Sequence, residues 1–290
     1  MTPPASRDAG PRGGARGPSW RGLGAVLLWG VLQGAFLLLE PPLAIALNLS
    51  LVAGAAWWFV ARPLARAARG ERAARWRAAT LRLRPLPGVA VPWLALAAVA
   101  LVGAAALSLA VVPRFIPVPI DRDNPLVRYL ARPLGGVAVF VAAVGIAPLL
   151  EELLFRGWMQ RTLERVVPVP VAIGATALAF AAVHLEAFGF PLRAALGAAA
   201  GTAAWSTRSI WPAVVLHAAY NGALLVASSA VPGVDERTLA LWARTDRIFW
   251  SALLGLLAAG ALAWWALGRM RRAVGRAVGP EPALAGGLRG

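Results

Sequence analysis

The chain has 290 residues, of which 59% are apolar and only 14% are charged. Soluble globular proteins contain about 45–50% apolar and about 25% charged residues, so the composition excludes an ordinary water-soluble domain. The net charge of +16 comes from arginine alone and lies between long apolar segments, which argues against a nucleic-acid-binding protein. Because the chain has no cysteine, disulfides and cysteine-ligated metal sites are also excluded. The composition therefore predicts a polytopic membrane protein.

The predicted architecture is all-α, a polytopic membrane helix bundle with about eight transmembrane helices. A helix needs about 20 apolar residues to cross the roughly 30 Å hydrocarbon core of a bilayer. The candidate segments are, in chain order, residues 23–39, 43–60, 89–112, 135–160, 168–188, 192–207, 211–231 and 248–268. The sixth is the weakest, because it is short and rich in glycine and alanine.

Three arginine-rich segments predict the orientation of the bundle: the N-terminal segment, the 62–84 loop and the segment after residue 268. With eight spans all three lie on one side, and arginine-rich segments stay cytoplasmic. We therefore expect a plasma-membrane protein with both termini cytoplasmic, 62–84 at anionic lipid, and 114–134 and 232–247 outside. A cleaved signal peptide is the alternative for the N-terminus, although the apolar run of 23–39 exceeds a usual signal core.

Ionisable residues within the predicted spans indicate a functional site. Glu151 and Glu152 are adjacent in the fourth span, and the only two histidines, His184 and His217, lie in the fifth and seventh. Asn221 follows His217 by four residues. Each ionisable residue costs about 2.5–3.5 kcal/mol within hydrocarbon, so such residues are usually functional and partnered. We therefore expect all five side chains to meet in one polar cavity.

Helical geometry separates the two glutamates. Glu152 and Arg156 stand four residues apart on one face, in the order that favours an ion pair. Glu151 points about 100° away and is predicted to be the base or ligand. Pro148 cannot donate to the carbonyl of Val144, so a kink is expected beside the carboxylates.

Together these residues resemble the CPBP family of intramembrane proteases. This family includes the type II CAAX prenyl endopeptidases and bacteriocin-processing or bacteriocin-immunity homologues. Three motifs on three apolar spans carry the resemblance: Glu151-Glu152-Leu-Leu-Phe-Arg156, Phe180-Ala-Ala-Val-His184 and His217-Ala-Ala-Tyr-Asn221.

The resemblance implies an endopeptidase that cleaves a membrane-associated protein or peptide without a covalent intermediate. Glu151, Glu152 and His184 would be the catalytic residues, with Glu151 and His184 activating water. His184, His217 and Asn221 would bind a metal or steady the developing oxyanion.

Two alternatives stay open for the cofactor. Two histidines, a glutamate and a water form an ordinary zinc set, so a divalent metal, zinc in the first place, is one of them. The other is a metal-independent glutamate base. Arg156 and Phe180 are expected to support the site structurally.

The resulting organisation is a disordered segment at 1–18, helices and the arginine-rich loop at 19–134, the catalytic core at 135–231, a last helix at 248–268, and a basic tail at 269–290. Two other functions would use the same polar cluster. One is a transporter or proton-relay protein, and the other is a pseudoenzyme acting in immunity or interaction.

Overall fold

The structure, a computed structural model, describes residues 41–62, 65, 81–116, 133–230 and 236–278. These residues form helices and one isolated β-bridge between Leu83 and Ser209, and no strand is present among them. The all-α prediction is therefore confirmed for the described residues. The predicted disordered segment 1–18 and the predicted first span, 23–39, lie outside them.

The helices form six groups in chain order. They are α2 (Pro41–Ala56) with η1 (Trp57–Ala61); η2 (Gly88–Ala90), α5 (Val91–Val111) and η3 (Val112–Arg114); α7 (Pro133–Phe140), η4 (Val141–Ile146), α8 (Ala147–Glu152), η5 (Leu153–Gln160) and α9 (Arg161–Leu163); α10 (Val169–Ala182); α11 (Phe190–Thr207) and α12 (Trp211–Ala230); and α13 (Glu236–Arg244) with α14 (Asp246–Val278).

Three of these helices are long and apolar enough to cross a membrane: Gly88–Arg114, Leu134–Leu163 and Asp246–Ala277. Two shorter apolar helices are Val169–Ala182 and Trp211–Val226. The membrane-helix architecture is thus supported, whereas the number of eight spans stays a prediction.

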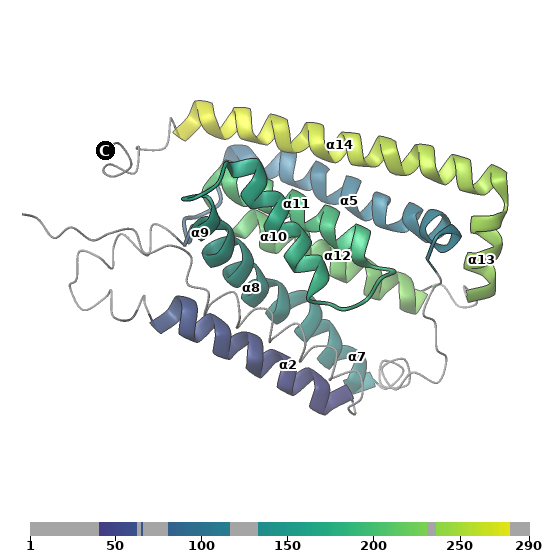
Figure 1. Cartoon of the computed structure of the whole chain (residues 1–290), viewed down its shortest axis with the longest axis horizontal. Coiled ribbons are helices and arrows are strands. Elements are labelled where there is room, and N and C mark those ends of the chain that lie inside the picture. Colours follow the sequence, from purple (N-terminus) through teal and green to yellow (C-terminus); the bar gives the residue numbers. More distant parts are fainter. Residues whose placement is uncertain (1–40, 63–64, 66–80, 117–132, 231–235, 279–290) are drawn as a thin grey trace, which may run out of the picture.

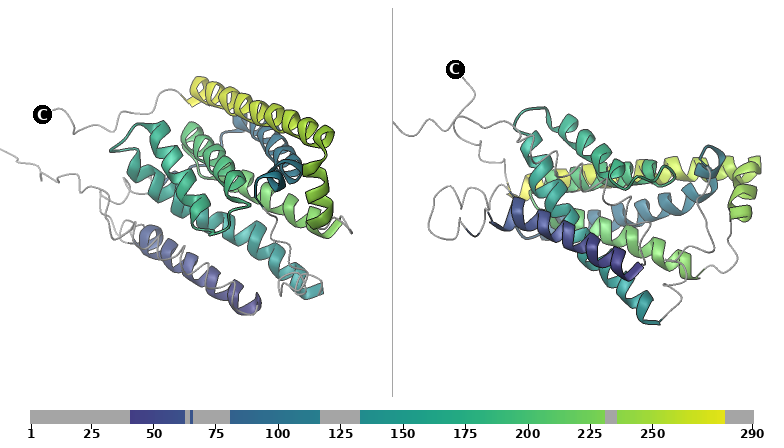
Figure 2. Two further views of the ribbon diagram at one scale, coloured as in Figure 1. Left: turned by 45° about the vertical axis from the view of Figure 1, so that its right-hand side comes forward. Right: turned by 60° about the horizontal axis from the view of Figure 1, so that its bottom comes forward.

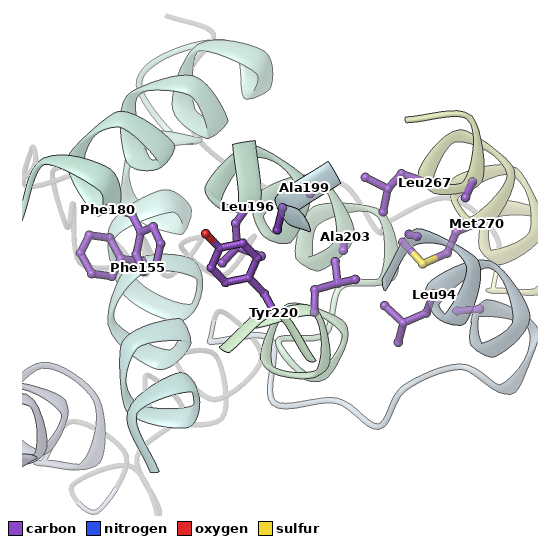
Figure 3. Close-up of a cluster of buried hydrophobic side chains, with 14 of the residues drawn as sticks. Leu94, Phe155, Phe180, Leu196, Ala199, Ala203, Tyr220, Leu267 and Met270 are labelled. Atoms are coloured by element: carbon purple, nitrogen blue, oxygen red, sulfur yellow. The ribbon is translucent and has the colours of Figure 1, made fainter. Parts of the chain in front are cut away.

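The helices pack around a core that runs through the middle of the molecule. α14 lies along α5 on one side, and α2 lies against α8 on the other (Figures 1 and 2). Figure 3 shows Tyr220 of α12 in this core, with Phe155 and Phe180 on one side and Leu94 and Met270 on the other. The core therefore joins α14 and α5 to the helices that carry the predicted site.

Two predicted helix ends are wrong. The helix predicted at 168–188 ends at Ala182, and Leu185 then adopts a left-handed backbone with φ 52° that no helix continues through. The helix predicted to end at residue 268 continues to Val278. Its extension is stabilised because Met270 and Val274 are buried.

The outside loop predicted at 232–247 contains α13 and the first residues of α14. α13 was missed because its charged ends mask a short amphipathic helix. Leu239 and Ala243 are buried, whereas Leu241 is exposed. α13 packs against α5 and η3, so it covers one end of the bundle.

At the opposite end, Arg82 connects the segment before α5 to the helices of the site through an ion pair and a backbone hydrogen bond. Its Nη2 atom lies 2.9 and 2.7 Å from the two carboxylate oxygens of Glu164, just after α9. The carbonyl of Arg82 also accepts the N–H of Ile210 at 2.9 Å, just before α12. Both side chains of the ion pair between Arg82 and Glu164 are about 3% exposed, so this ion pair is buried.

Candidate active site

The helix that carries the two glutamates is interrupted on both sides of them. α8 holds Glu151 and Glu152 and lies between the π-helical segments η4 and η5. In η4 the N–H of Ala147 bonds to the carbonyl of Ala142, five residues back. The next donor in this register would be Pro148, which has no N–H.

Asn221 supplies the missing donor. In the five-residue register the carbonyl of Ala143 would await the N–H that Pro148 lacks. The Nδ2 atom of Asn221 donates to that carbonyl at 2.8 Å. This bond ties α12 to η4. The role of Asn221 at a metal or an oxyanion stays a prediction.

Glu152 is the centre of a buried charge cluster. Its Oε2 atom lies 2.9 Å from Nε of Arg156, and both side chains have 0% exposure. The predicted ion pair is therefore confirmed. Its Oε1 atom accepts a hydrogen bond from Nδ1 of His217 at 2.9 Å, because a carboxylate offers only acceptors. The Arg156 guanidinium also stacks near Phe180, with Cζ 5.3 Å from the ring centroid.

Glu151 is buried but is not held in this way. Its Oε2 atom has no hydrogen-bond partner among the described residues. This oxygen lies 3.9 Å from Nε2 of His217, which is too long for a direct hydrogen bond. The two ring nitrogens of His217 thus face the two glutamates, one closely and one across a gap.

His184 approaches the cluster through Phe180. The Phe180 ring packs edge-to-face against His184 and His217, at centroid distances of 5.0 and 5.3 Å. Nδ1 of His184 donates to the carbonyl of Phe180 at 2.8 Å, so Nε2 is the acceptor of the neutral ring. Phe180, expected to support the site, therefore contacts both histidines. The structure brings His217, and not His184, into the pair of glutamates.

The described residues do not form a preassembled set of three metal ligands. A catalytic zinc takes three protein ligands at about 2.0–2.2 Å for nitrogen and oxygen. Within residues 41–62, 65, 81–116, 133–230 and 236–278, no three histidine, aspartate or glutamate side chains are grouped in that way. Nδ1 of each histidine is already bonded, to Glu152 and to Phe180, so Nε2 would be the metal-binding atom of each ring. The predicted zinc stays a prediction that metal analysis of the purified protein decides.

The site is more open on the side of His184. Glu151, Glu152, Arg156 and His217 are all buried, whereas His184 is half-buried. His184 belongs to residues 183–189, which connect α10 to α11.

This connection leads to an ion pair that the sequence analysis did not single out. Glu186 and Arg193 are joined across the start of α11. Their spacing of seven residues was the available signal. It was weak, because the connection had been assigned to a continuous helix.

Comparison with known proteins confirms the family resemblance over the site. Residues 133–223 match the family model described as type II CAAX prenyl endopeptidase Rce1-like. This match begins with α7 and includes all three motifs. No curated protein and no solved structure matches the chain. Together with the apolar helices, the match indicates an integral membrane protein in which residues 133–223 are similar to an intramembrane protease family.

Proposed function

We propose that this chain, whose residues 133–223 are similar to the Rce1-like endopeptidases, hydrolyses a peptide bond of a membrane-associated protein or peptide. One observation supports the proposal most strongly: His217 lies between two carboxylates that differ in their bonding. Glu152 is bonded to His217 and paired with Arg156, whereas Glu151 faces His217 across 3.9 Å. Such a gap accommodates one bridging water.

The bridging water would be the nucleophile. With Nδ1 of His217 donating to Glu152, the Nε2 atom of the neutral ring is an acceptor. Glu151 Oε2 is a second acceptor on the other side of the gap. A water that donates one hydrogen to each presents its oxygen lone pairs to the substrate. The two side chains thus orient the water before the reaction.

Hydrolysis then needs one proton transfer in each direction. Glu151 takes a proton from water as the water oxygen bonds to the carbonyl carbon of the peptide. When the C–N bond breaks, Glu151 returns this proton to the departing amine. Glu152 and Arg156 are positioning residues, because they fix the tautomer and orientation of His217. His184 faces the more open side of the site. There its Nε2 atom can accept a hydrogen bond from water or from the product of hydrolysis.

The first substrate to test follows from the family description, which names CAAX prenyl endopeptidases. We propose a prenylated peptide as the first candidate, and a small precursor peptide or a regulatory membrane protein as the next ones. The site lies in helices that pack within a bilayer, so all of these substrates share a membrane-associated segment.

The experiment is a cleavage assay in proteoliposomes with the purified chain. Wild-type protein is expected to cleave a farnesylated peptide or a member of a membrane-peptide library, and Glu151→Gln is expected to lose this activity. Asp246→Asn is the matched control, since Asp246 is an exposed carboxylate at the start of α14. If no peptide is cleaved while the same vesicles show solute or proton flux, the chain is a transporter and the proposal fails.

A further inference from the structure

A half-buried ion pair stands beside the candidate site. Nη1 of Arg193 lies 2.6 Å from Oε2 of Glu186, and the two side chains are 25% and 29% exposed. Oε1 of Glu186 accepts the N–H of Gly189 at 2.8 Å, so both oxygens of this carboxylate are bonded. The pair thereby closes the connection from α10 to α11 into a fixed loop.

Arg193 lies next to the half-buried side of the site. Its partner Glu186 follows His184 by two residues, so the ion pair holds the guanidinium close to His184. The other arginine of the site, Arg156, is fully buried against Glu152. Of these two arginines, only Arg193 is accessible to a ligand.

The Arg193 guanidinium retains hydrogen-bonding capacity. Arginine has five N–H donors in a planar fork that suits a carboxylate. The guanidinium makes one hydrogen bond, from Nη1 to Glu186, whereas Nε and Nη2 bond to no described residue. Glu186 neutralises the cation, which limits the cost of placing it in a site of low dielectric constant.

We propose that Arg193 binds a carboxylate of the peptide substrate, either its C-terminal carboxylate or an acidic side chain near the scissile bond. This inference rests on the proposed function. The uncompensated Glu151 repels an anionic peptide, so a site that accepts such a peptide needs a cation on its accessible side. Arg193 meets this need while Nη1 keeps Glu186, and Nε and Nη2 face the substrate.

Gly189 allows the position of the guanidinium to be tested separately from its charge. A Cβ atom at Gly189 would lie 2.6 Å from Oε2 of Glu186 and 2.7 Å from Cζ of Arg193. The backbone of Gly189 has φ −82°, which alanine adopts without strain. Gly189→Ala should therefore displace the ion pair while every charge is retained.

The experiment compares three dansyl-labelled farnesylated peptides: one with a free C-terminal carboxylate, the same peptide amidated, and the amidated peptide with an internal aspartate. Binding is measured by fluorescence on the Glu151→Gln protein and cleavage on the wild type. Arg193→Gln should raise the Kd and KM of the preferred acidic peptide about 10- to 100-fold and leave kcat little changed. The reason is that hydrogen bonds to charged groups contribute about 1.5–3 kcal/mol. The Kd and KM of the amidated peptide without aspartate should not change in this variant.

Two further variants sharpen the comparison. Arg193→Lys should recover part of the preference, and Gly189→Ala should reduce it as Arg193→Gln does. Arg114→Gln is the matched control, because Arg114 forms an ion pair with Asp246 away from the site. Whichever acidic peptide responds identifies the source of the carboxylate.

Equal Kd values for all three peptides, absence of binding, or an equal loss for all three in Arg193→Gln would overturn the inference. Binding is read without turnover, so this outcome differs from failure of the proposed function, in which the wild type binds peptide and cleaves none.

Discussion

Glu151 and Glu152 are neighbours in sequence but face different surroundings. Glu152 meets Arg156 and His217 at 2.9 Å each, so its charge is compensated on both oxygens. Glu151 is buried with one oxygen that has no partner among the described residues. A carboxylate with compensated charge stabilises the fold, whereas one with an unsatisfied oxygen retains an acceptor for a further hydrogen bond.

We expect Glu152→Gln to destabilise the protein strongly. The change removes the anion that compensates the fully buried Arg156, and breaking a buried ion pair from one side costs about 3–5 kcal/mol. It also exchanges the acceptor of His217 Nδ1 for an amide. Thermal unfolding in detergent measures the loss.

Glu151→Gln should instead fold like the wild type and lose hydrolysis. An amide cannot take a proton from water, and loss of general-base catalysis lowers rates about 10²–10⁴-fold. Unfolding and cleavage are measured on the same preparation. If Glu151→Gln unfolds while Glu152→Gln is merely inactive, the roles of the two glutamates are reversed.

At this scale the sequence was informative only where partners share a helix. The Glu152–Arg156 pair follows from a spacing of four residues, which fixes their relative position. The bond between Glu152 and His217 joins residues that are 65 positions apart, and no local rule determines it. The pairing of His217, rather than His184, with the glutamates therefore required the tertiary structure.

At the scale of elements, the π-helical interruption around Pro148 binds two helices together. Asn221→Ala should cost about 1–3 kcal/mol, because the carbonyl of Ala143 loses its donor. In a Pro148→Ala background the new backbone N–H can serve that carbonyl or restore the helix. The cost of Asn221→Ala should then shrink, which a double-mutant cycle by chemical unfolding measures. Equal costs in both backgrounds would show that the proline is not the reason for this bond.

α10 and α11 approach each other closely at Gly197. A Cβ atom at Gly197 would lie 2.9 Å from the Cα of Ala177, so the helices must separate to accept a larger residue. We expect Gly197→Ala to destabilise the protein by about 1–3 kcal/mol and to lower cleavage. Gly174→Ala in α10 is the matched control, since a Cβ there meets nothing within 4 Å. Equal stability of the two variants would contradict the tight packing.

The helix ends show what apolar runs can and cannot predict. The predicted segments 89–112 and 135–160 agree closely with the helices Gly88–Arg114 and Leu134–Leu163. The reason is that a long apolar run bounded by polar residues predicts a single membrane helix with defined ends. α10 was overextended, since most residues between Ala182 and Gly189 are apolar although the backbone turns at Leu185. The Glu186–Arg193 pair depends on that turn, so it was missed together with it.

For the whole molecule, the arginines predict the orientation. α14 has 33 residues, which corresponds to about 50 Å, so its two ends can reach opposite surfaces of a bilayer. Because the chain has no cysteine, single substitutions report accessibility cleanly. A membrane-impermeant maleimide should label Arg237→Cys on intact cells and Arg276→Cys only after permeabilisation. The reverse pattern would place the arginine-rich end outside.

The buried ion pair between Arg82 and Glu164 has a consequence for how the protein folds during its synthesis. Glu164 is 82 residues further along the chain, and at about 5–20 residues per second a ribosome needs roughly 4–16 s to make that stretch. Until then no Glu164 carboxylate exists to neutralise Arg82. The bond from Ile210 to the Arg82 carbonyl must wait longer still. The segment before α5 is thus synthesised early, whereas its contacts with the ends of α9 and α12 can form only late.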